Sequence, residues 1–97
     1  MKVSEWLQGE EAKMQERTIK AIANRRRVGI LKYLKKEKQA TVQEIARAIK
    51  LSMKATSRHL IILSGADIVE REQRSIHVYY WIKKEQNMIV KHLILTL

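Results

Sequence analysis

Two helix-start signals that lie close together, at Thr41 and Ser52, constrain the fold of this chain more than any other feature. Thr41 and Glu44 form the capping-box pattern, in which the hydroxyl and the carboxylate each accept a hydrogen bond from a backbone N–H at the helix start. Ser52 is a second residue of a type that caps helices. Only Leu51 separates it from the predicted end of the first helix near Lys50. The pattern predicts two short helices joined by a tight turn, which is a helix-turn-helix.

The second helix, predicted over residues 52–63, has one apolar face and one basic face. Met53, Thr56, Leu60 and Leu63 recur at helical spacing, so we expect them to face the core. The opposite face offers cations, hydroxyls and a methyl group, which can read base edges in a major groove. Taken alone, the stretch fits a half-buried surface helix better, and its surroundings decide in favour of DNA. The expected DNA contacts on this helix are Ser52, Met53, Lys54, Ala55, Ser57, Arg58 and His59.

Composition indicates one small domain, residues 1–97, with a polyanionic partner. Hydrophobic residues make up 45% of the chain and charged residues 31%, which is typical of a globular protein. The net charge is +10, and four of the ten acidic residues precede Arg17, so the remaining body is strongly basic. A basic body attracts nucleic acid first and an anionic membrane second. Cysteine, an apolar run of membrane-spanning length and a secretory signal are all absent from the sequence, so we expect a cytoplasmic protein.

The two ends of the chain carry apolar residues that a small core cannot easily absorb. One helix is predicted over residues 4–23 with Ser4 as its cap. The segment 83–97, predicted to be the C-terminal dimerisation helix, starts polar and becomes strongly apolar from Met88 onward. A symmetric homodimer would bury both segments, and it needs fewer assumptions than a membrane-surface anchor. The expected dimer contacts are Trp6, Leu7, Met14, Met88, Ile89, Leu93 and Ile94.

An arginine triplet and a hairpin complete the predicted core of residues 24–82. Asn24 is expected to cap a helix whose first turn is Arg25, Arg26 and Arg27, where cations oppose the helix dipole. A phosphate at that position and simple solvation explain the triplet equally well. The expected phosphate contacts are these three arginines and Thr41.

Two runs of β-branched and aromatic residues, 68–71 and 76–82, bracket a polar stretch, Glu72–Ser75, that is predicted to be a turn. The result is a mostly helical protein with a small β-hairpin, or wing, beside the second helix of the helix-turn-helix. The expected DNA contacts from the wing are Arg71, Gln73 and Arg74.

From about Ala23 to Ile82 the sequence resembles the ArsR family of winged-helix repressors. The resemblance is carried by residues 23–31, by the Leu51-Ser52 turn, by residues 57–60 (Ser-Arg-His-Leu) and by residues 78–80 (Val-Tyr-Tyr). It implies a homodimer, paired through its first and last helices, that binds a two-fold symmetric operator and represses transcription. The recognition helix would read the major groove of double-stranded DNA, and the wing would contact the adjacent backbone or minor groove.

The metal-sensing residues of that family are missing. The family's Cys-x-Cys pair is replaced by Thr41 and Gln43, and His92 is the one potential ligand kept on the last helix. We therefore expect no metal and no cofactor, and the effector stays unknown. Lys50 replaces the glycine common in the turn of a helix-turn-helix, and Asp67 replaces the one common at the end of the recognition helix. A left-handed backbone at Lys50 would cost roughly 1–2 kcal/mol, and Asp67 tolerates that conformation better.

Other function classes are weighed against this interpretation. An enzyme is not expected, because the sequence offers no nucleophile–base pattern, no glycine-rich phosphate loop and no paired carboxylates. A winged helix that binds RNA or a protein partner remains the alternative, since a fold does not dictate its function.

Overall fold

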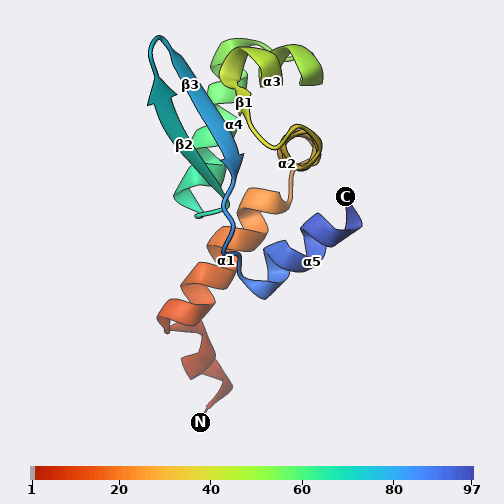
Figure 1. The fold of residues 1–97 in the computed structure, drawn as a ribbon. Helices are drawn as coiled ribbons and strands as arrows, with labels where there is room; N and C mark the ends of the chain where they lie inside the picture. The colour runs from red at the N-terminus through yellow and green to blue at the C-terminus, as the bar shows by residue number, and fades with distance from the viewer. Residues whose placement is uncertain (1) are drawn as a thin grey trace.

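The computed structural model describes residues 2–97, which form a helical body with a β-hairpin on one side (Figure 1). The order is η1 (Val3–Leu7, a 3₁₀ helix), α1 (Glu10–Ile22), α2 (Arg25–Glu37), β1 (Ala40–Thr41), α3 (Val42–Ile49), α4 (Met53–Gly65), β2 (Val69–Arg74), β3 (His77–Ile82) and α5 (Met88–Thr96). This is the predicted winged helix-turn-helix, with α3 and α4 as the helix pair and β2–β3 as the wing.

The prediction of a single helix over residues 4–23 is wrong. The chain forms η1, leaves the helical conformation at Gly9 (φ −78°, ψ 163°) and begins α1 only at Glu10. Ser4 therefore lies inside η1 rather than at a cap. Glycine favours such a break because it loses the most conformational freedom inside a helix. The resulting arm projects from the body (Figure 1), and the molecule with its arm measures 50 × 25 × 22 Å along its principal axes.

The three predicted caps of the central helices are confirmed. Asn24 accepts hydrogen bonds from the backbone N–H groups of Arg26 and Arg27 at the start of α2. The Thr41 hydroxyl accepts from the Glu44 N–H at 3.2 Å, while the Glu44 carboxylate accepts from the Thr41 N–H at 2.8 Å. That backbone hydrogen bond lowers the pKa of Glu44. Ser52 caps α4 by accepting from the N–H of Ala55 at 3.1 Å.

The turn between α3 and α4 uses a left-handed lysine. Lys50 has φ 55° and ψ 51°, and its N–H bonds the carbonyls of Ala46 and Arg47. Asp67, which follows α4, is also left-handed, with φ 58°. Lys50 and Asp67 therefore both adopt, with a side chain present, the left-handed backbone that glycine favours.

The sheet has the order β1-β3-β2 and is antiparallel throughout. Glu72, Gln73 and Arg74 were predicted to be in the turn but belong to β2, because Arg74 pairs with His77 and only Ser75 and Ile76 form the loop. Ser75 is left-handed, with φ 59°, and Ile76 is 84% exposed at the tip. Strand β1, which the sequence did not predict, pairs Ala40 with Tyr80 and Thr41 with Tyr79.

One core joins α2, α3, α4, the sheet and α5. Its fully buried side chains include Ile30, Leu31, Leu34, Ile45, Leu60, Leu63, Ile68 and Val90. Thr56, Leu60 and Leu63 face this core as predicted, whereas the prediction for Met53 is wrong. Met53 is 49% exposed because it is the first residue of α4 and lies beyond the packed turns. Within residues 2–97, no helix is long and apolar enough to cross a bilayer.

Candidate nucleic-acid interface

The free face of α4 is basic at its N-terminal half. Lys54 and Arg58 are one helical turn apart and exposed, and within residues 2–97 neither forms an ion pair with a carboxylate. Ser52 is exposed at the cap, while Ala55 and Ser57 are half-buried beside the cations. The geometry presents two long donors and short side chains between them, which is the combination that can reach base edges without steric obstruction.

The hairpin loop lies at the same end of the molecule as α3, opposite the N-terminal arm (Figure 1). Because successive side chains of a strand point to opposite faces of the sheet, the predicted wing contacts are divided between two faces. Arg71 and Gln73 pair with Tyr80 and Val78 on the side that turns toward the core. Arg71 donates a long 3.5 Å hydrogen bond to the Tyr80 hydroxyl, and Gln73 donates to the Ser75 carbonyl.

Arg74 lies on the outer face of the wing and is held by four groups. Its Nε donates to the Glu72 carboxylate at 2.5 Å, and its Nη1 donates to the Gln39 side chain at 3.0 Å. The guanidinium lies 4.7 Å from the ring centroid of Tyr79 and 5.9 Å from that of Trp81. Because Gln39 directly precedes β1, Arg74 joins the wing to the start of the helix-turn-helix. Sequence reasoning missed this cluster, although a cation opposite alternating aromatics was a usable signal.

The arginine triplet does not act as one group. Arg25 and Arg26 are exposed, whereas Arg27 is partly buried. The Arg27 guanidinium donates to the carbonyls of Ala21 at 2.6 Å and Lys20 at 3.1 Å, at the C-terminal end of α1. Its third contact is His59 Nδ1 of α4, at 3.1 Å. Arg27 therefore links three helices, which leaves it poorly placed to hold a phosphate as well.

This contact fixes the state of His59. Arginine stays protonated and can only donate, so His59 Nδ1 must be the acceptor and the proton of the neutral ring lies on Nε2. Burial, followed by the charges of Arg27 and Arg26, lowers the pKa of His59 below 6.5. At neutral pH His59 is an uncharged residue that helps to position α4.

Thr41 was predicted to contact a phosphate, and the structure does not favour that role. It is only 8% exposed, its backbone pairs with Tyr79, and its hydroxyl is the cap of α3. Lys50 offers an exposed cation nearby in the turn before α4, and it was not predicted as a DNA contact.

The predicted dimer residues fall into two groups. Trp6, Leu7 and Met88 are exposed apolar side chains, Met88 at 63%. Met14, Ile89, Leu93 and Ile94 are half-buried, and Leu93 and Ile94 pack against the chain's own core. Leu95, which was not predicted, is 74% exposed on α5. A surface available to a partner therefore lies on η1 and on α5.

Side chains that could bind a metal ion are not clustered in the described part of the chain. In residues 2–97 no group of three or more His, Asp or Glu side chains is arranged to hold a metal ion.

Comparison with known proteins supports the interpretation of this fold as a winged helix-turn-helix regulator. Residues 24–71 match the family model of bacterial regulatory proteins, arsR family. Reduced HlyU from Vibrio cholerae is 27% identical with a TM-score of 0.76, covering 95% of this chain and 93% of that one. The homodimeric winged helix-turn-helix DNA-binding domain from Mycobacterium bovis is 27% identical with a TM-score of 0.80, covering 93% and 81%.

The transcriptional repressor PagR of Bacillus anthracis is 26% identical with a TM-score of 0.73, covering 89% of this chain and 94% of PagR. No curated protein matches the chain significantly.

Proposed function

We propose a function that follows from the family of this chain, which belongs through residues 24–71 to the arsR family of bacterial regulatory proteins. The protein binds double-stranded DNA sequence-specifically as a homodimer and represses transcription. The observation that carries the proposal is the exposed basic face of α4, with Lys54 and Arg58 free of carboxylate partners within residues 2–97. The similar domain from M. bovis is homodimeric and the similar PagR is a repressor, and we transfer both properties to this chain.

Each contact then has a role set by its position. Lys54, Ser57 and Arg58 read base edges, while Met53 and Ala55 provide apolar contact to thymine methyl groups. Arg25 and Arg26 hold phosphates and set the register of the protein on the duplex. From the wing, Arg71, Gln73 and Arg74 contact the backbone beside the recognition helix. Arg74 can do so despite its contacts within the wing because 43% of its side-chain surface stays exposed. Arg27 and His59 position α4 through their mutual hydrogen bond and are not assigned a DNA contact.

The homodimer would bring two α4 helices to one face of the duplex. The exposed apolar residues on η1 and α5, Trp6, Leu7, Met88 and Leu95, are the surface that a second copy would cover. Two-fold symmetry then requires a palindromic operator with half-sites about one helical turn apart.

Selection of random genomic duplex fragments at two salt concentrations tests the proposal. We expect enrichment of a palindrome with that half-site spacing. Binding without enrichment, lost steeply as salt rises, would leave only an electrostatic nucleic-acid binder. A preference for RNA over duplex DNA at matched salt would favour the RNA-binding alternative.

Two variants separate base reading from backbone contact. Lys54→Ala should lower affinity for the operator by about 1–3 kcal/mol and relax the preference at one base pair. Arg74→Ala should weaken binding to all sequences and reduce the salt slope. Equal losses on operator and random DNA for Lys54→Ala would contradict the role given to Lys54.

A further inference from the structure

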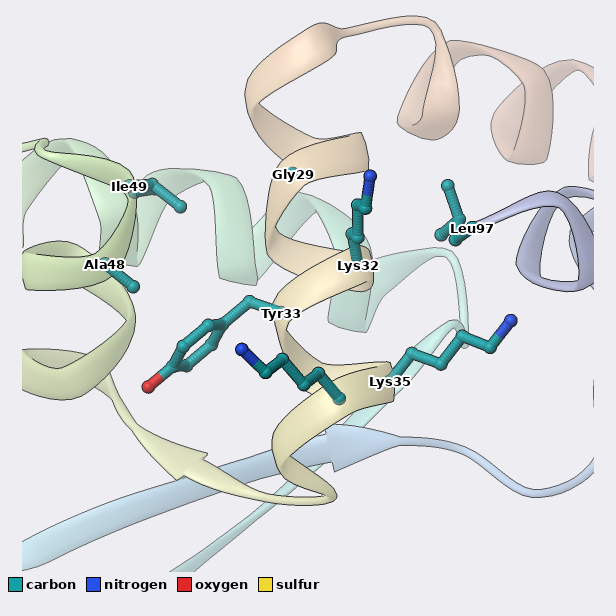
Figure 2. A pocket seen from close by; sticks show the side chains of 8 residues that line it. Gly29, Lys32, Tyr33, Lys35, Ala48, Ile49 and Leu97 are labelled. Atoms are coloured by element: carbon teal, nitrogen blue, oxygen red, sulfur yellow. The ribbon is translucent and has the colours of Figure 1, made fainter.

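A groove of about 560 Å³ crosses the exposed side of α2. Figure 2 shows Ala48 and Ile49 of α3 on one side of it and Leu97, the last residue, on the other. Tyr33 and Gly29 of α2 lie between them. The groove owes part of its depth to Gly29, since nothing lies within 4 Å of the position that a Cβ atom would take there. Its size falls within the range of small-molecule sites in proteins.

The lining combines an apolar floor with a cationic rim. Three lysines of α2, Lys32, Lys35 and Lys36, complete the lining, and no aspartate or glutamate contributes to it. The amine of Lys35 donates to the carbonyl of Ile94 at 2.8 Å, so it is already engaged by α5. Lys32 and Lys36 are exposed, and within the described chain neither has a carboxylate partner. The groove therefore offers two free positive charges beside apolar surface.

We propose that this groove binds an amphipathic carboxylate of the medium-chain fatty-acid type. The alkyl chain lies along Tyr33, Ala48 and Ile49, where it removes apolar surface from water. The carboxylate lies between the amines of Lys32 and Lys36 and accepts charge-assisted hydrogen bonds from them. A nucleic-acid phosphate satisfies the rim but leaves the apolar floor unused, so a ligand with both properties fits the lining better.

The position of the groove suggests a regulatory consequence, which rests on the proposed function. It touches α3, the first helix of the helix-turn-helix, and the end of α5, the helix proposed to dimerise. The proposed alkyl chain contacts α3 directly, and Leu97, which follows α5, lines the opposite side of the same groove. The ligand changes DNA affinity to the extent that it binds the free and DNA-bound forms of the protein differently.

Isothermal titration of the full chain with decanoate, below its micellar concentration, tests the binding step without DNA. We expect one decanoate per chain. The double variant Lys32→Ala/Lys36→Ala should weaken binding about fivefold, as is typical when exposed charge pairs are removed. Gly29→Leu should abolish binding by filling the groove, and nothing lies within 4 Å of the position that its Cβ atom would take. Decanol, which lacks the charge, should bind more weakly than decanoate to the unmodified protein.

The matched control is Lys13→Ala/Lys20→Ala, which removes the same charge from α1, outside the groove lining. It should bind decanoate with unchanged affinity. Equal weakening in both double variants, or unchanged binding by Gly29→Leu, would overturn the site.

A Gly29→Leu protein that becomes monomeric, together with no binding of decanoate by the unmodified dimer, would instead assign the groove to contact between copies. Because the titration contains no DNA, its failure leaves the operator selection above unaffected.

Discussion

At the scale of single residues, two side chains of α4 affect the stability of the fold in ways that the sequence pattern does not predict. His59 is locked to Arg27, and Thr56 is buried at 0% exposure with no hydrogen-bond partner for its hydroxyl in the described chain. The pairing of His59 could not be predicted, since the helical pattern identifies the buried side of α4 but not which residue of α2 meets it. Each side chain leads to a stability measurement.

Stability should fall below neutral pH because of His59. The unfolded chain binds a proton near the ordinary pKa of 6.5, whereas the folded chain binds one only at lower pH. The stabilisation is therefore complete above about pH 6.5 and is lost as the pH falls through the lowered pKa. Urea unfolding at pH 7 and pH 5 measures it: His59→Gln should lose less stability over this interval than the unmodified protein. The exposed His92→Gln should behave like the unmodified protein, and an identical pH response in all three would contradict the assignment.

Thr56→Val should stabilise the protein by about 1 kcal/mol, because valine has nearly the same shape and removes a buried hydroxyl that has lost its water. Thermal unfolding would show a raised Tm with unchanged DNA affinity. Thr18→Val is the contrasting change: Thr18 is equally buried, but its hydroxyl accepts a hydrogen bond from Asn87 at 3.1 Å. That variant should lose stability, and a gain in both would show that the hydrogen bonding is not decisive.

At the scale of elements, caps and periodicity made α2, α3 and α4 predictable, because each signal lies within a few neighbouring residues. The wrong or missing predictions for strands arise because the position of a strand depends on residues that are distant in the sequence. Polar residues are exposed in a turn and on a solvated strand alike, so Glu72–Arg74 could not be assigned before the register with β3 was known. Strand β1 is only two residues long and exists because β3 lies beside it.

Lys50→Gly should stabilise the helix-turn-helix by about 1 kcal/mol, since glycine adopts the left-handed backbone of the turn without strain. The midpoint of urea unfolding measures the change. The matched substitution Arg47→Gly, inside α3, should destabilise by about the same amount. If Lys50→Gly also destabilised, the lysine side chain would have to contribute more than its backbone strain removes.

At the scale of the whole molecule, the net charge and the apolar residues at both ends of the chain predict a DNA-binding dimer. The proposed partner surface can be tested with Leu95→Glu, which should weaken dimerisation at least about tenfold because it removes an apolar contact from each copy. Sedimentation equilibrium measures the monomer fraction. Ile76→Glu changes an equally apolar and more exposed residue, at the wing tip, and should leave the dimer intact. A monomeric Ile76→Glu protein would move the interface to the wing.

The pairing of β3 with both β1 and β2 has a consequence for how this fold can be modified. The wing is not a separate appendage, because its inner strand also holds Ala40 and Thr41, and Arg74 reaches back to Gln39. A chimera that transplants a hairpin from another protein into residues 69–82 would leave the Gln39 side chain without Arg74, and it would keep the backbone pairing with β1 only if the register of β3 were preserved. Exchange of the wing therefore has to preserve that register and has to change residue 39 together with the hairpin.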